Sequence, residues 1–181
     1  MKGLALACAL LAPIALAGCN EKPASALPPP HKMTAEAIGH YCGMNLLEHG
    51  GPKGQILAAS LIEPVWFSSV RDTIAFTMLP DEPKDIQVIY VSDMAKAPSW
   101  DKPGADNWVE ARKALFVIES RAKGGMGGEE AVPFSDRAAA EKFVAENGGR
   151  VVRFADVPHD YVLGPVDERA GAGPDERAAA Q

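Results

Sequence analysis

The chain has 181 residues and is acidic, with 24 Asp and Glu against 18 Lys and Arg, which gives a net charge of −6. No stretch of the sequence is strongly basic, so nucleic acid is excluded as an expected partner. The length allows one or two small domains.

The first residues are predicted to be an export signal. Lys2 precedes an apolar run over residues 4–17, which is typical of a secretory signal and short for a membrane span. The run ends in Leu-Ala-Gly-Cys, the pattern of a bacterial lipobox. Residues 1–18 are therefore predicted to be a lipoprotein signal peptide, with Cys19 as the lipid attachment site. The alternative is an ordinary signal peptide cut near Ala17, which would leave Cys19 as a free thiol.

Residues 19–36 are predicted to form an extended tether. Their prolines stand among alanine and serine, a composition that favours polyproline conformations and cannot bury a core. The tether would hold the folded part away from the bilayer, with Met33 exposed.

Cys42 follows in the string His40-Tyr41-Cys42-Gly43-Met44. It has no partner for an internal disulfide, because Cys8 lies in the export signal and Cys19 is predicted to carry lipid. A lone thiol in an oxidising compartment needs a function. The thiol of Cys42 and the thioether of Met44 are ligands that soft metal ions prefer, with Cu(I) the best candidate.

An internal repeat organises the folded part of the chain. Residues 63–68 and 130–135 share the pattern Glu-x-Val-x-Phe-Ser. An apolar run precedes each motif, and a helical stretch and a β-branched run follow it. Each unit is therefore predicted to be a strand-strand-helix-strand (ββαβ) unit. The predicted strand runs are residues 55–59, 86–91, 115–118 and 151–154.

Local signals define the two helices. Ser68 and Ser135 are predicted to be their N-caps, and Gly148-Gly149 is predicted to end the second helix. Phe143 is expected to face the core of the second unit.

A unit of about 50 residues buries too little surface to be robust alone. The two units are therefore expected to pack together in an α+β fold. The first spans residues 37–98, and a connector with the second unit spans residues 99–165. Trp100 and Trp108 in the connector are interpreted as packing between the units. Residues 166–181 are predicted to be disordered.

The second unit contains an insertion that the first lacks, Lys123-Gly124-Gly125-Met126-Gly127-Gly128. Glycines on both sides of a methionine predict a mobile loop rather than core. Because the Cys42 segment is likewise absent from the repeat, the two insertions suggest one shared site. Met126 would complete a three-sulfur Cu(I) site with Cys42 and Met44.

Other metal chemistry fits the sequence less well. Structural zinc needs four ligands at finger-like spacings, and a Cys-x-x-Cys redox motif is absent from the sequence. His40 and His49 remain open as nitrogen ligands.

The order of these motifs resembles the NosL family of copper-binding lipoproteins that accompany nitrous oxide reductase. The resemblance extends from Cys42 to about Gly164. It is carried by the lipobox, by Cys42-Gly43-Met44, by Trp108-Val109-Glu110-Ala111, by Phe116-Val117-Ile118-Glu119-Ser120, and by Gly125-Met126-Gly127 followed by Val132-Pro133-Phe134.

The resemblance implies two ββαβ units, one bound Cu(I), and help in loading the copper centres of nitrous oxide reductase. It also implies a lipid-anchored position at the periplasmic face of a bacterial membrane, beside a maturation ABC transporter. The family's cysteine and methionine motif falls on Cys42 and Met44, and its glycine-flanked methionine falls on Met126. Relatives often have a second cysteine just before this motif. Here His40 and Tyr41 take its place, which leaves a histidine ligand open.

Three functions compete. The first is a metallochaperone, which is not an enzyme, holding Cu(I) with Cys42, Met44 and Met126. The second is a thiol-dependent enzyme with Cys42 as nucleophile, which needs a base such as His40 beside the thiol. The third is a module that docks the transporter and binds metal incidentally.

Overall fold

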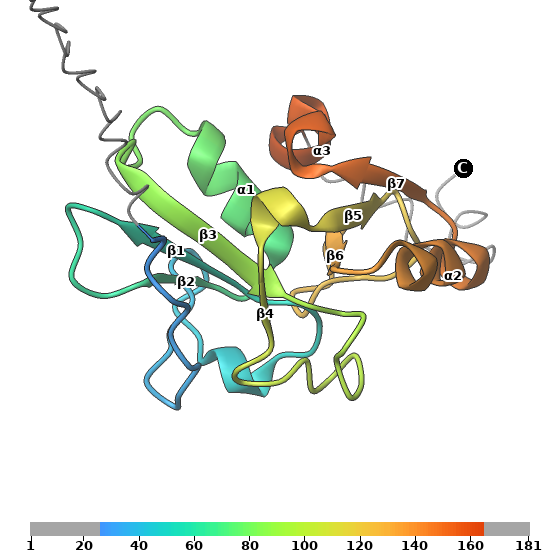
Figure 1. Cartoon of the computed structure of the whole chain (residues 1–181), viewed down its shortest axis with the longest axis horizontal. Coiled ribbons are helices and arrows are strands. Elements are labelled where there is room, and N and C mark those ends of the chain that lie inside the picture. Colours follow the sequence, from blue (N-terminus) through green and yellow to red (C-terminus); the bar gives the residue numbers. More distant parts are fainter. Residues whose placement is uncertain (1–25, 165–181) are drawn as a thin grey trace, which may run out of the picture.

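The computed structural model describes residues 26–164 (Figure 1). The predicted signal peptide, Cys19 and the predicted tail over residues 166–181 lie outside the described residues, as does the first part of the tether. In the part of the chain that is described, no helix has the length and apolar character needed to cross a membrane.

The first unit is an antiparallel sheet packed against a helix. Strand β1 (Gly54–Ala58) lies between β2 (Val65–Phe67) and β3 (Ile86–Ser92), and α1 (Val70–Met78) connects β2 to β3. A fourth strand, β4 (Trp108–Glu110), pairs with the free edge of β3. The sequence did not predict β4, because three residues are too few to show a strand period.

The second unit repeats this order in a smaller sheet. Strand β5 (Leu115–Ile118) lies between β6 (Val132–Phe134) and β7 (Arg150–Arg153), and α2 (Arg137–Asn147) connects β6 to β7. In both units the strand that comes first in the chain is central, which confirms the predicted ββαβ duplication. The short helices are η1 (Leu46–Glu48), η2 (Ala111–Lys113), η3 (Phe154–Asp156) and α3 (His159–Leu163).

Both long helices begin one residue later than predicted. The side chain of Ser69, not of Ser68, accepts a backbone N–H at the start of α1, and Asp136, not Ser135, does so at the start of α2. Each helix is preceded by two adjacent residues that can cap it, so the residue types alone do not decide between them. Gly148 ends α2 with φ 72°, as predicted.

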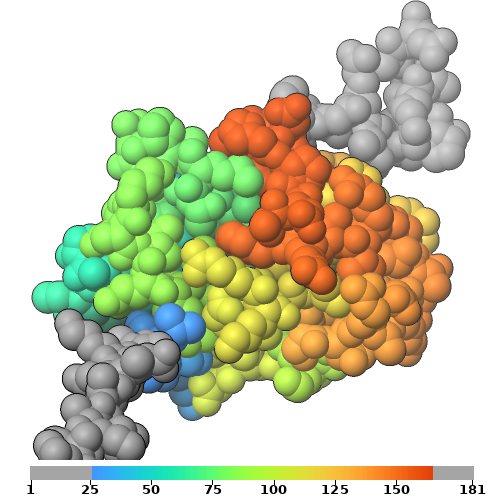
Figure 2. All heavy atoms as spheres, turned by 45° about the horizontal axis from the view of Figure 1, so that its top comes forward, coloured from blue at the N-terminus to red at the C-terminus, as the bar shows by residue number. Residues whose placement is uncertain are grey.

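The two units share one hydrophobic core, which confirms that they pack together. Ile56 and Phe67 of the first unit belong to the same buried cluster as Phe116 and Ile118 of the second. Figure 2 shows the units side by side, with the C-terminal segment lying between α1 and the second unit. Within that segment α3 contacts α1 directly.

Only one of the two connector tryptophans packs between the units. The Trp100 ring stacks on Phe143 of α2, with 6.3 Å between ring centroids, and its carbonyl accepts a hydrogen bond from Gly51 of the first unit. Trp108 packs on Trp66 within the first sheet instead. The interpretation is therefore wrong for Trp108, because β4 keeps this residue in the first unit.

The second half of the predicted tether is folded onto the first unit. Met33 is 4% exposed and packs in a small cluster with Ala37 and Leu46. The side chain of Gln55 hydrogen-bonds to both backbone groups of His31. The prediction that Met33 is exposed is wrong, because its apolar side chain is removed from water against this unit.

Candidate metal centre

Cys42 lies in a tight turn over residues 39–44. The N–H of Gly39 donates to Met44 O at 2.9 Å, and the N–H of Gly43 donates to Gly39 O at 2.8 Å. Gly43 has φ 67°, a conformation that favours glycine. A Cβ at Gly39 would collide with Cys42 Sγ, so the thiol is folded back over its own turn.

This turn is held against the junction of β2 and α1. The N–H of His40 donates to Trp66 O at 2.7 Å, and Cys42 Sγ lies 3.3 Å from Ser68 Oγ. Cys42 is half-buried and is the free cysteine of the described residues. The thiol therefore faces the β2–α1 junction while part of its residue stays accessible to solvent.

The two histidines near Cys42 differ in how they are engaged. Nε2 of His40 lies 3.5 Å from Glu82 Oε1, and its ring packs edge-on against Phe67 and Phe76. Nε2 of His49 is buried and has no hydrogen-bond partner among residues 26–164. Both histidines stay predictions as nitrogen ligands.

Met126 lies at the tip of a short hairpin between β5 and β6. Lys123 and Glu129 pair across this hairpin, and the N–H of Gly124 donates to Gly128 O at 2.9 Å. The Met126 side chain is 52% exposed. The insertion is thus a closed turn that presents a thioether to solvent. We call it the Met126 hairpin, residues 123–129.

The Met126 hairpin packs on the segment that follows the Cys42 turn. A Cβ at Gly125 would lie 2.7 Å from Gly50 O and 2.8 Å from His49 Cβ. Two backbones approach this closely only where a side chain is absent. The Met126 hairpin therefore contacts the chain at residues 49–50, a few residues after the Cys42 turn.

Lys53 lies next to this meeting point. Its side chain is fully buried, and Nζ donates to Gly50 O at 2.7 Å, Gly51 O at 3.0 Å and Ser68 O at 3.4 Å. Burial lowers the pKa of Lys53 to about 8. A buried amine thus joins residues 50–51 to Ser68, the residue whose hydroxyl contacts the thiol.

The donor atoms here suit a soft ion. No group of three or more His, Cys, Asp or Glu side chains able to hold a metal occurs in the described part of the chain. A metal site there has to include methionine sulfur or use fewer of these ligands. Cys42, Met44 and Met126 supply one thiol and two thioethers, which are donors that suit Cu(I). This ligand set stays a prediction.

Sequence reasoning missed residues that shape the site. Ser68 is predicted from the sequence to cap α1, whereas its hydroxyl contacts Cys42. Lys53 was not singled out, although it directly precedes β1, a strand buried at every residue and free of charge. A charged residue at the start of such a strand is a usable signal of a buried charge.

The fold and motifs agree with known proteins. The model of the family described as NosL matches residues 30–162. The chain belongs to the NosL family. A NosL relative from Achromobacter cycloclastes, a copper-binding lipoprotein, is 48% identical over 153 residues, which cover 84% of this chain and 79% of the relative.

Two further NosL proteins extend the comparison. The copper-binding lipoprotein NosL of Stutzerimonas stutzeri is 29% identical over 151 residues, covering 82% of this chain and 77% of that relative. The crystal structure of the copper chaperone NosL from Shewanella denitrificans superposes with a TM-score of 0.68 at 33% identity, covering 73% of this chain and 98% of that one. The NosL resemblance stated from the sequence is confirmed.

Proposed function

We propose that this protein is a copper chaperone that holds one Cu(I) between the Cys42 turn and the Met126 hairpin. The observation that carries the proposal is the packing of Gly125 on His49 and Gly50, because it places the hairpin beside the segment that follows the thiol. Family membership supports it, since two relatives are called copper-binding lipoproteins and a third a copper chaperone.

The proposed ligands suit uptake and release. Cu(I) accepts few ligands and favours sulfur, and the thioethers of Met44 and Met126 bind without losing a proton. The Cys42 thiol must lose one, so copper affinity should rise with pH. Because the Met126 side chain is 52% exposed, an approaching partner could replace it as a ligand first.

Delivery is proposed to serve the copper centres of nitrous oxide reductase, together with its maturation ABC transporter. The lipid on Cys19 would hold the protein at the periplasmic face of the membrane. The support for the anchor is the lipobox at Cys19 and the lipoprotein names of the two relatives.

The thiol-enzyme alternative finds less support in the geometry. A catalytic thiol needs a base or a cation beside it. Cys42 Sγ has the hydroxyl of Ser68 as its hydrogen-bond neighbour, and Nε2 of His40 is directed at Glu82. The amine of Lys53 acts on Cys42 through its charge, but it donates its hydrogen bonds to backbone carbonyl groups rather than to the thiol.

A competition titration tests the proposal. The full-length protein in detergent is titrated anaerobically with Cu(I) against a coloured Cu(I) chelator. We expect one Cu(I) per chain. Cys42→Ser removes a proposed ligand, so its loss of Cu(I) affinity should be larger than the roughly 10–100-fold loss that is typical when an outer-shell group is changed. Met78→Leu, a methionine on α1 that packs against the core, is the matched control and should keep the affinity. Unchanged affinity in Cys42→Ser would sink the proposal.

A further inference from the structure

Two ionisable side chains, one from each unit, are buried beside the candidate copper site. Lys53 is 0% exposed and Glu130 is 1% exposed. Burying a charge is costly unless the group is paired and hydrogen-bonded. Neither residue is among the proposed copper ligands, so both need another explanation.

Glu130 lies two residues before β6, and its side chain extends to the start of α1. Its Oε1 accepts hydrogen bonds from the N–H of Arg71 at 2.9 Å, the N–H of Ala131 at 2.9 Å and Ser69 Oγ at 3.4 Å. Its Oε2 is buried and has no hydrogen-bond partner among the described residues. Only half of this carboxyl group is therefore satisfied.

The unsatisfied oxygen faces the Met126 hairpin. A Cβ at Gly124 would lie 2.7 Å from Glu130 Oε2. Gly124 opens the turn, because its carbonyl accepts from Gly127 and its N–H donates to Gly128. Glu130 thus packs directly against the backbone that orients Met126.

Lys53 contacts the same hairpin indirectly, through its bond to Gly50 O, on which Gly125 packs. At the β2–α1 junction, the side chains of Lys53 and Glu130 also bind two consecutive residues. Lys53 binds Ser68 O, and Glu130 binds Ser69 Oγ. Each of these two side chains therefore joins the Met126 side of the site to the β2–α1 junction, against which the Cys42 turn is held.

We propose, on the basis of the proposed copper-binding function, that Lys53 and Glu130 are positioning residues of the copper site. They fix the Met126 hairpin relative to the Cys42 turn and so set copper affinity without touching the ion. Outer-shell groups at metal sites commonly change affinity by about 10–100-fold when they are removed.

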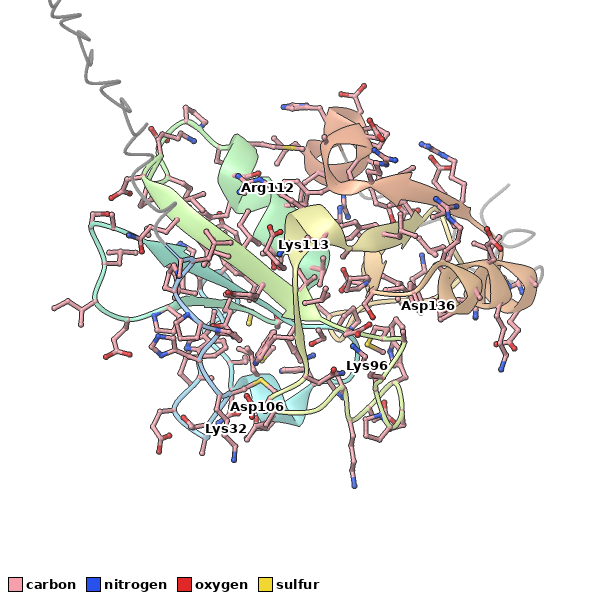
Figure 3. The ribbon with its side chains drawn as sticks, in the orientation of Figure 1. Lys32, Lys96, Asp106, Arg112, Lys113 and Asp136 are labelled. Atoms are coloured by element: carbon pink, nitrogen blue, oxygen red, sulfur yellow. The ribbon has the colours of Figure 1, made fainter. Side chains whose placement is uncertain are left out.

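Asp93 offers a matched control. It is 1% exposed and also joins the two units, since its carboxylate accepts from the N–H of Ser135 at 2.9 Å and from Ser135 Oγ at 2.6 Å. Figure 3 labels Lys96 and Asp136, which lie beside this junction at the start of α2. Asp93→Asn removes an equally buried charge between the units without loosening the Met126 hairpin.

A double-mutant cycle on Cu(I) affinity tests the proposal in the full-length protein. We expect Glu130→Gln, and likewise Lys53→Met, to lose about tenfold affinity alone but little more in a Met126→Leu background, because the hairpin then has no sulfur to position. Asp93→Asn should keep the wild-type affinity. An additive cycle, or an equal loss in Asp93→Asn, overturns the positioning role.

A second pair of variants tests the same contact from the hairpin, with both charges intact. Gly124→Ala places a methyl group against Glu130 Oε2 and should lower affinity as Glu130→Gln does. Gly128→Ala, whose Cβ would meet nothing within 4 Å, should not. Equal affinities in these two variants contradict the proposal.

The proposed function and the positioning role fail in different ways. If the wild-type protein binds no Cu(I), both are overturned. If it binds Cu(I) and Cys42→Ser abolishes binding, but the cycle is additive, only the positioning role is overturned. X-ray absorption adds a readout that general destabilisation does not move. Copper in Glu130→Gln should have one sulfur neighbour fewer than in Asp93→Asn, and equal sulfur counts overturn the role.

Discussion

Each unit extends one buried carboxylate to the start of the other unit's helix, and the two are satisfied to different extents. Asp93, directly after β3, binds Ser135 through both oxygens, and Lys96 Nζ lies 2.9 Å from its Oδ2. Glu130, just before β6, binds the first turn of α1 through Oε1 alone.

The pKa values of the two groups move in opposite directions. Burial alone would raise the pKa of Asp93, but hydrogen bonds from Ser135, Lys96 and Ala95 outweigh burial and leave the pKa below its usual value. For Glu130 burial wins, and the pKa rises to about 7. Asp93, bonded through both oxygens, fixes one junction of the units. Glu130, bonded through one oxygen, makes the other junction, beside the Met126 hairpin, sensitive to pH.

Comparison of the two repeated motifs shows that only the second motif contributes a buried glutamate. Glu63 occupies in the first motif the place that Glu130 occupies in the second, yet Glu63 is exposed and Glu130 is buried. The sequence around both residues follows one pattern. The difference arises because the second motif is preceded by the Met126 hairpin, which covers Glu130.

The largest expected effect is on the pH dependence of stability. Folded Glu130 keeps its proton up to about pH 7, whereas the unfolded chain loses it near the ordinary value of 4.5. Between these values the folded state binds more protons, so the free energy of unfolding falls as pH rises. The charge of Asp72 raises the pKa of Glu130 further, and Glu130 in turn acts on Lys53 through its charge.

Urea unfolding of wild type and Glu130→Gln at pH 4.5 and pH 8 measures this effect. The wild type should lose roughly 3 kcal/mol relative to Glu130→Gln across that range. Glu63→Gln makes the same change at the exposed position of the repeat and should follow the wild type. If the free energy of unfolding changes with pH in the same way in wild type and Glu130→Gln, the pKa of Glu130 is not raised and the contrast with Asp93 fails.

The next effect concerns the satisfied junction. Asp93→Asn replaces a charged acceptor of two Ser135 hydrogen bonds with a neutral amide, and it should lower the free energy of unfolding by about 1–3 kcal/mol at pH 7. The loss should shrink as pH falls through the folded pKa of Asp93, because the wild-type carboxylate then takes up a proton. If Asp93→Asn is as stable as the wild type in urea at pH 7, the hydrogen bonds of Asp93 do not make its junction firmer than that of Glu130.

The duplicated fold was predictable because each strand and helix has a local signal. Hydrophobic runs bounded by turn residues marked the strands, and Gly148 marked the end of α2. β4 was not predictable, because it is three residues long and depends on pairing with β3. The burial of Met33 escaped for a similar reason, since a proline-rich segment gives no sign of the surface it will cover.

In the candidate site, too, residues with a local sequence signal were predictable and tertiary contacts were not. The lone thiol in an oxidising compartment predicted Cys42 and Met44 as ligands, and the glycine-flanked insertion that the first unit lacks predicted Met126; this ligand set stays a prediction. The contacts that join their loops were not predictable. Gly125 packs on Gly50, and Glu130 packs on Gly124, through the tertiary fold alone. Burial of Glu130 in particular could not be read from a motif whose other copy exposes its glutamate.

The smallest expected effect separates the two kinds of bond at the Asp93 junction. The Lys96 side chain is 70% exposed although Asp93 is buried, so water screens their ion pair. Lys96→Ala should therefore cost less than about 1 kcal/mol in urea unfolding, and the cost should decrease further in high salt. A loss as large as that of Asp93→Asn would instead place the strength of the junction in the ion pair. In that case the hydrogen bonds to Ser135 would no longer explain why this carboxylate, unlike Glu130, is held firmly.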